Sequence, residues 1–196
     1  MPKPSLRDAI LHAGLKAMFR TGYHGTSVRD VTAAAGAPQG SFTNHFRSKE
    51  AFASEVLDRY FEHTKGLVAE ALQDTSLTPR ARLRRYLDII TGRLADDGFN
   101  RGCLIGDFSL EASGSSELLR ARLADIFAAW RVPFADCIAE AQARGEIASD
   151  FDAGELADFL LASWQGAILR MKVDRNPKAL ERFKTIAFQT VFKEPS

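Results

Sequence analysis

Residues 25–50 read GTSVRDVTAAAGAPQGSFTNHFRSKE, and this stretch decides the fold of the N-terminal part of the chain. Thr26 can cap a first short helix, because its hydroxyl can accept one of the free backbone N–H groups at a helix start. Gly36 is suited to end that helix, and Pro38 is suited to open a second one that runs to about His45. The pattern predicts two short helices separated by a tight turn.

The second of these helices is amphipathic. Phe42 and Phe46 are four residues apart, so both can anchor one face of the helix in a core. The other face carries small and amide-bearing side chains, and amides can pair two-pronged with adenine. A short helix held by buried phenylalanines with a polar outer face suits insertion into a DNA major groove. The residues that project from it are Gln39, Ser41 and Asn44.

The same stretch resembles the N-terminal motif of the TetR family of bacterial one-component transcriptional regulators. The segments that carry the resemblance, in the family's order and spacing, are Gly22-Tyr23, Thr26-Ser27-Val28, Ala35-Gly36, Gly40-Ser41-Phe42, His45-Phe46 and Ser48-Lys49-Glu50. The family usually has a phosphate-contacting tyrosine where this chain has Thr43, which keeps a hydroxyl but loses the ring and its reach. The resemblance implies a helix-turn-helix that binds double-stranded DNA.

The motif and the resemblance together give a set of candidate DNA-binding residues. For any one of them the alternative is a solvated polar face, and His45 could instead brace the turn. The candidates are Thr26, Ser27, Arg29, Gln39, Gly40, Ser41, Thr43, Asn44, His45 and Lys49.

Charge is distributed unevenly along the 196 residues. Residues 1–50 hold seven Lys and Arg against three acids, a net charge of +4, whereas residues 51–196 have a net charge of −3. A basic N-terminal segment is typical of a chain that meets a polyanion at one end. No apolar run is long enough for a membrane span, residues 1–5 lack the apolar core of a signal peptide, and two cysteines do not indicate a disulfide scaffold. We therefore expect a cytoplasmic protein that does not bind membranes.

Helical periodicity continues through the remaining chain, so we predict an all-α fold of about nine helices. Ser5, Ser48 and Asp152 are suited to cap helices, and Thr78-Pro79 is suited to begin another. Pro133 should kink the long apolar helix in which it falls. The expected division is a three-helix DNA-binding domain at 1–47 and a larger effector-binding and dimerisation domain at 48–196. The resemblance implies the same division.

The last two helices are predicted to form a dimer interface. Apolar residues cover more than one stripe of the helix that begins after Asp152, so it should bury two faces. Two-fold symmetric DNA sites favour a homodimer, although both helices could instead pack only on their own subunit. The candidate interface residues are Phe159, Ser163, Gly166, Ala167, Phe183 and Ala187.

The larger domain is expected to bind a small-molecule effector. Large aromatic residues there could line a pocket or could be plain core, and a thiol and a carboxylate beside an apolar stripe could meet a polar ligand group. The candidates are Tyr86, Cys103, Asp107, Phe108, Trp130, Phe134 and Trp164.

Besides a repressor with a reversibly bound effector, the sequence leaves open a regulator whose sensor is the Cys103 thiol. The segment 101–106 (RGCLIG) resembles a TetR subgroup that includes regulators responding to electrophiles, and a helix N-terminus beside Arg101 could lower the pKa of Cys103. The alternative is a small buried thiol. A third possibility is an architectural DNA binder without a ligand, against which the size of the second domain argues.

An enzyme is the rival class. All four histidines lie in the first third of the chain, and no zinc-ligand spacing, Gly-rich phosphate loop or Gly-x-Ser-x-Gly elbow occurs. We therefore expect neither a catalytic site, nor a metal, nor a cofactor. The sequence is most consistent with a homodimeric, ligand-responsive repressor that binds a palindromic operator.

Overall fold

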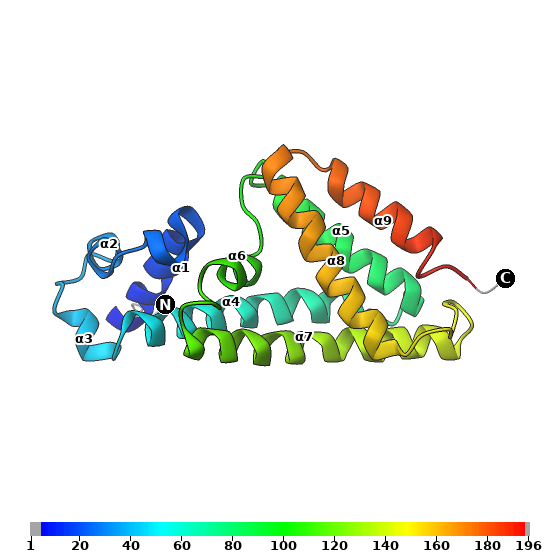
Figure 1. Cartoon of the computed structure of the whole chain (residues 1–196), viewed down its shortest axis with the longest axis horizontal. Coiled ribbons are helices and arrows are strands. Elements are labelled where there is room, and N and C mark those ends of the chain that lie inside the picture. The colour runs from blue at the N-terminus through cyan, green and yellow to red at the C-terminus, as the bar shows by residue number, and fades with distance from the viewer. Residues whose placement is uncertain (1–4, 195–196) are drawn as a thin grey trace. The chain divides into compact units, whose positions relative to one another are not determined.

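The computed structural model describes residues 5–194, and the elements found in this range are α-helices (Figure 1). This confirms the predicted all-α fold. Within the described residues the helices are α1 (Leu6–Gly25), α2 (Val28–Ala34), α3 (Ser41–His45), α4 (Lys49–Leu72), α5 (Pro79–Ala95), α6 (Leu104–Glu111), α7 (Glu117–Ala143), α8 (Ala153–Asp174) and α9 (Lys178–Gln189).

The chain forms two compact units, which we describe separately. Unit 1 contains residues up to 63 together with 104–126, and unit 2 contains 64–103 together with the chain from 127 onward. Unit 1 thus combines α1–α3 with the first part of α4, α6 and the first part of α7. The expected boundary between a DNA-binding domain at 1–47 and an effector-binding and dimerisation domain at 48–196 stays a prediction.

Polar caps set most helix starts where the sequence indicated. The hydroxyl of Ser5 accepts a hydrogen bond from the backbone N–H of Asp8 at 3.1 Å, and Ser48 accepts one from Ala51 at 3.1 Å. Thr78 caps α5 in the same way, and the Asp152 carboxylate accepts from two N–H groups at the start of α8. These four caps confirm the predicted starts of α1, α4, α5 and α8.

The helix-turn-helix differs from the prediction at two points. The cap of α2 is Ser27, whose hydroxyl accepts from Asp30 N–H at 3.1 Å, and Thr26 does not cap the helix. Thr26 is buried, and its hydroxyl donates to the Gly22 carbonyl at 2.7 Å. The second helix begins at Ser41 instead of Pro38, because the preceding residues form a turn in which the Ser41 N–H donates to the Pro38 carbonyl.

Helix α1 contains a break that positions the rest of unit 1. Gly22 has φ +73° and ψ 179°, so the regular helix stops there and one further turn leads to Gly25. The left-handed region is open to glycine at little cost. The sequence-based expectation that Gly22 ends the first helix matches this break.

Unit 2 is held together by an apolar core and by cations that reach across helices. In α5, Arg80 donates to the carbonyls of Phe188 and Phe192, and Lys184 of α9 donates to Asp88 of α5 at 2.7 Å. Figure 1 shows α8 and α9 side by side. The described helices include none that is long and apolar enough to cross a bilayer.

Helix α7 continues through Pro133 without a break, and the predicted kink there stays a prediction. Proline removes the hydrogen bond to the carbonyl four residues earlier. That carbonyl belongs to Ala129, which is exposed, so water can satisfy it.

Candidate DNA interface and regulatory surfaces

Three phenylalanines fix the short helix α3 to unit 1. The ring centroids of Phe42 and Phe46 lie 5.1 Å apart, and both rings meet Phe52 of α4, at 5.1 and 4.8 Å. All three side chains are buried. A five-residue helix has little stability of its own, so this aromatic triangle is what orients its outer face.

The outer face of α3 and of the turn before it is polar and exposed. Gln39, Thr43, Asn44 and His45 are exposed, and Ser41 is half-buried. The Thr43 hydroxyl donates to the Gly40 carbonyl at 3.0 Å, which holds the short side chain against its own helix. The amides of Gln39 and Asn44 remain exposed on this face.

The N-terminus of α2 presents a second polar group of residues. Ser27 and Arg29 are exposed, and Ser27 also donates to the Asp30 carboxylate at 2.6 Å. Thr26 is only 2% exposed and its hydroxyl is used internally. We therefore remove the Thr26 side chain from the candidate DNA contacts and assign it a bracing role.

Lys49 is more enclosed than a typical phosphate-binding lysine. Its ammonium donates to the His24 carbonyl at 3.4 Å and lies 4.6 Å from the centre of the Tyr23 ring. Burial lowers the pKa of Lys49, and the negative charge of Glu111 opposes that change. The first turn of α4 is thus tied to the end of α1.

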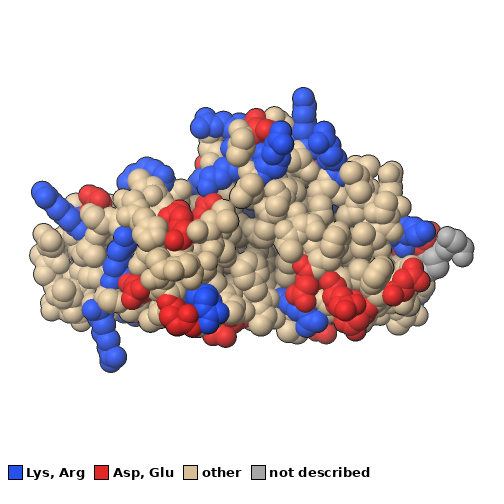
Figure 2. Space-filling view, viewed as in Figure 1, with Lys and Arg blue, Asp and Glu red and all other residues tan. Residues whose placement is uncertain are grey.

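Basic residues beyond the predicted set also lie in unit 1. His12, Lys16 and Arg20 follow each other at four-residue spacing on α1. They border a hollow of about 530 Å³ that is also lined by the end of α2 and by the pair Asp8–Arg59. In Figure 2, Lys and Arg side chains project from the surface that carries α1–α3. This positive charge favours binding of a polyanion.

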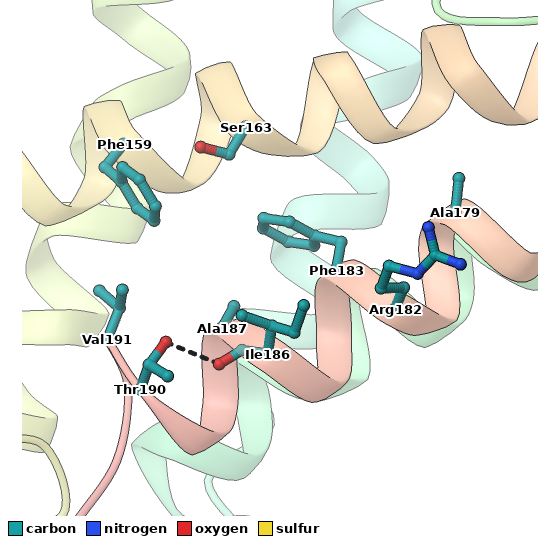
Figure 3. Close-up of a pocket in the computed structure, with 9 residues that line it drawn as sticks. All are labelled: Phe159, Ser163, Ala179, Arg182, Phe183, Ile186, Ala187, Thr190 and Val191. Atoms are coloured by element: carbon teal, nitrogen blue, oxygen red, sulfur yellow. Dashed lines mark hydrogen bonds between the residues drawn. The ribbon is translucent and has the colours of Figure 1, made fainter.

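An apolar groove runs between α8 and α9, and Figure 3 shows its walls. Phe159 and Ser163 of α8 face Phe183, Ile186 and Ala187 of α9 across a hollow of about 280 Å³. Ala187 is buried at its floor, whereas Phe159 and Ile186 are 45% and 54% exposed. Four of the six predicted dimer residues therefore line one groove.

The remaining two predicted dimer residues lie on the same helix. Gly166 is exposed, with nothing within 4 Å of the position of a β-carbon, and Ala167 is half-buried. Leu169 and Val173, which are not among the predicted interface residues, are also exposed on α8. Exposed apolar side chains of this size on one helix indicate an interaction surface.

The candidate effector residues are divided between the two units. Tyr86, Trp130, Phe134 and Trp164 belong to the core of unit 2, where the rings of Tyr86 and Phe134 meet edge-on at 4.8 Å. Phe108 belongs to unit 1, where its ring lies 5.6 Å from that of Tyr23.

Asp107 is half-buried beside Phe108 on α6 and also belongs to unit 1. The grouping of all seven residues around one ligand stays a prediction.

Cys103 is buried, with 8% of its surface exposed, and Arg101 pairs with Asp97 at 2.8 Å. Burial limits access of an electrophile to the thiol, and the Arg101 guanidinium is engaged by a carboxylate. The structure therefore does not favour the thiol-sensing variant. Among the described residues, no group of three His, Cys, Asp or Glu side chains is arranged to hold a metal ion.

Comparison with known proteins decides the family. Residues 10–56 match the family described as "Bacterial regulatory proteins, tetR family", and residues 79–187 match "Tetracyclin repressor-like, C-terminal domain". The chain belongs to the TetR family. It is a DNA-binding transcriptional regulator and not an enzyme, and regulators of this family typically act as dimers with small-molecule effectors.

Two curated relatives of this TetR-family protein are similar over most of their length. The HTH-type transcriptional repressor DhaR of Mycobacterium sp. (strain GP1) is 44% identical, with 97% of this chain and 94% of the relative covered. The transcriptional regulator AcuR of Cereibacter sphaeroides is 35% identical, with coverage of 93% and 84%.

Solved structures show the same fold. A regulatory protein TetR from Rhodobacter sphaeroides superposes with a TM-score of 0.87 at 34% identity, covering 93% of this chain and 97% of that one. The reduced form of Escherichia coli NemR superposes with a TM-score of 0.86 at 23% identity, covering 98% and 100%, and this likeness concerns the fold alone.

One contact within unit 1 could not be predicted from the sequence. The Glu111 carboxylate at the end of α6 accepts a hydrogen bond from the His24 backbone N–H at 3.2 Å. The two residues are 87 positions apart, and nothing in either local pattern links them. The contact depends on where α6 packs, which only the fold reveals.

Proposed function

We propose that this TetR-family regulator is a homodimeric repressor that binds a palindromic operator in the cytoplasm and is released by a small effector. The observation that carries the proposal is the exposed polar face of α3 mounted on the buried Phe42–Phe46–Phe52 triangle. A rigidly held short helix with amides on its outer face has the form that reads bases in a major groove. The repressor name of the 44% identical relative DhaR supports the direction of regulation.

In the proposed complex each subunit places α3 in one major groove. The two half-sites then lie about 34–36 Å apart along the duplex, or a multiple of this. Gln39 and Asn44 are assigned to base edges, and the N-terminus of α2 suits a phosphate, because its N–H groups and dipole favour negative charge. The remaining proposed contacts are Ser27, Arg29, Gly40, Ser41, Thr43, His45 and Lys49.

The proposal is tested by fluorescence anisotropy with a genomic fragment that the wild-type protein selects. Gln39→Ala and Asn44→Ala should each cost about 1–3 kcal/mol at this site and relax the preference at one base pair. Gln73→Ala, which removes an exposed amide from unit 2, is the matched control and should bind like the wild type. If the wild type selects no genomic fragment even at low salt, the proposal is wrong.

The effector is proposed to bind among the aromatic residues of unit 2. Trp164 is 1% exposed, and the described residues offer no acceptor within hydrogen-bond distance of its Nε1–H group. A buried donor without a partner is costly, so a ligand with an acceptor oxygen would be favoured there. Burial also raises the pKa of Tyr86, which keeps its phenol neutral.

A thermal-shift screen can test this assignment with small apolar compounds that differ only in having or lacking a carbonyl or carboxylate group. We expect stabilisation by members that carry the acceptor, and weaker stabilisation of Trp164→Phe by the same compounds. Equal shifts for Trp164→Phe and wild type would remove Trp164 from the effector site. To release the operator nearly completely, the effector must prefer the released state by roughly 10⁴-fold.

A further inference from the structure

The carboxylate of Glu111 lies against the break in α1, at the base of the helix-turn-helix. Its Oε2 accepts the His24 N–H at 3.2 Å, and the Glu111 backbone carbonyl lies 2.9 Å from His24 Nε2. A carbonyl can only accept, so the imidazole donates from Nε2. Side chain and backbone of Glu111 thus both hold His24.

Gly22 provides the space for this contact. A β-carbon at Gly22 would overlap the Glu111 carboxylate, and the φ of +73° at Gly22 also disfavours any other residue. The backbone of α1 and the end of α6 therefore approach each other as closely as a glycine allows.

The same cluster holds the start of α4. Lys49 donates to the His24 carbonyl and lies over the Tyr23 ring, which also meets the ring of Phe108 of α6 at 5.6 Å. Glu111 is the charge that opposes the effect of burial on the pKa of Lys49. His24 precedes the Ser27 cap by three residues, and Lys49 follows α3, so the cluster borders both ends of the DNA-reading segment.

We propose that Glu111 is a positioning residue for operator recognition. It does not touch DNA. It fixes residues 22–24 and, through them, Lys49, and so sets the placement of the α2 N-terminus and of α3. This inference rests on the proposed function, because it assumes that these elements bind an operator.

Electrostatics alone predicts that removing Glu111 strengthens DNA binding, whereas a positioning role predicts that it weakens operator binding. The Glu111→Ala change deletes a negative charge from a DNA-binding unit, which strengthens attraction to every phosphate backbone. A positioning role predicts weaker binding to the operator only, because base contacts depend on geometry and backbone attraction depends much less on it. The ratio of operator affinity to random-sequence affinity therefore separates the two.

The experiment measures both affinities by fluorescence anisotropy on the whole 196-residue chain. The probes are the fragment selected by the wild type and a random-sequence duplex of equal length. Glu111→Ala should lose about tenfold in operator affinity, the size expected for one lost charge-assisted hydrogen bond, with random-duplex binding unchanged or tighter. Glu117→Ala is the control, because Glu117 is an exposed acid of the same unit that pairs with Arg120.

Two further variants keep the test decisive if Glu111→Ala does not fold. Glu111→Gln loses the same charge but keeps an acceptor oxygen at full reach, so it should bind the operator within about threefold of the wild type. Glu111→Asp keeps the charge but is one methylene shorter, so it should lose affinity. The reverse order of these two variants would overturn the proposal.

A double-mutant cycle probes the close approach itself. Gly22→Ala carries a backbone cost and an overlap with Glu111, and only the overlap disappears in the Glu111→Ala background. The two changes should therefore be less than additive in operator affinity. If the wild type selects no fragment, the proposed function is wrong. If it selects one, but the ratio of operator affinity to random-duplex affinity is unchanged in every Glu111 variant, only this inference is wrong.

Discussion

Gly14 lies in α1 at the place where the Phe52 ring occupies the space that a β-carbon would need. Phe52 is one corner of the aromatic triangle under α3, so it has little freedom to move. We expect Gly14→Ala to lower the free energy of unfolding by about 1–3 kcal/mol, although alanine has the higher helix propensity. Urea denaturation measures this loss, and operator affinity should fall with it because α3 loses its support.

Gly66 provides the matched control for Gly14. It lies inside α4, is exposed, and has open space around the position of a β-carbon. Gly66→Ala should therefore stabilise the protein by about 0.5–1 kcal/mol through helix propensity. If both alanine variants changed stability equally, the close approach at Gly14 would have no energetic role.

Cys137 is predicted to resist alkylation. Burial raises the pKa of its thiol from 9.0 to about 11, and the Sγ atom lies 3.3 Å from the Pro79 carbonyl. Only the thiolate reacts, so near pH 8 the reactive fraction should be roughly 100-fold below that of an ordinary thiol.

Mass spectrometry after iodoacetamide treatment measures this reactivity, with urea-unfolded protein as the reference. The native rate should rise with pH up to about 11, because the raised pKa keeps the thiol protonated below that value. A native rate equal to the unfolded rate at pH 8 would contradict the assignment.

At the scale of elements, Lys184 fixes α9 to α5. Its side chain is 4% exposed and donates to Asp88 at 2.7 Å, and it pairs with Glu181 at 2.6 Å. The two carboxylates are about half exposed, so water can solvate them if the cation is removed. Truncating the partners of a buried charge is more damaging than replacing the charge by an apolar group.

We therefore expect Lys184→Met to change the free energy of unfolding by less than about 1 kcal/mol, and the double change Asp88→Ala with Glu181→Ala to cost about 3–5 kcal/mol. Urea denaturation at one fixed protein concentration compares the two, because the proposed dimerisation would make stability depend on concentration. The opposite ranking would show that the salt bridge itself, and not the burial of an unpaired cation, controls docking of α9.

Most elements could be predicted because their signals are local. The start of α8 follows from Asp152 alone, since a carboxylate there can accept from the next free N–H groups. Thr26 and Ser27 were ambiguous, because adjacent hydroxyls compete for the same cap. The folded structure decides between them: Thr26 is buried and its hydroxyl donates to the Gly22 carbonyl, whereas Ser27 is exposed and caps α2.

The site was predictable to a similar extent. The polar face of α3 follows from i, i+4 spacing, whereas the contact of Glu111 with His24 depends on helix packing that no local pattern encodes. Phe108 and Trp164 were grouped because both are large and apolar, and composition does not tell which unit a residue joins. Aromatic residues in a core and aromatic residues around a ligand look the same in sequence.

For the whole molecule, the groove between α8 and α9 is the surface that a second copy is proposed to cover. Exposed apolar side chains flank it on both helices, among them Phe159 of α8 and Ile186 of α9. A two-fold axis places the same surface on both subunits, so each α8–α9 pair would meet its own copy. A palindromic operator needs two reading helices at fixed spacing, and this interface would set that spacing.

A charge at Gly166 should separate dimerisation from folding. Gly166 is exposed, with open space where a side chain would go, so Gly166→Glu should not disturb the isolated subunit. In the dimer the carboxylate would be buried without a partner and would hold the helices apart. Light scattering at micromolar concentration should show a dimer for the wild type and a folded monomer for Gly166→Glu, with operator binding lost although α3 is unchanged. Gly92→Glu places the same charge at an open position of α5 and should remain a dimer, so a monomeric wild type, or a dimeric Gly166→Glu, would rule out this interface.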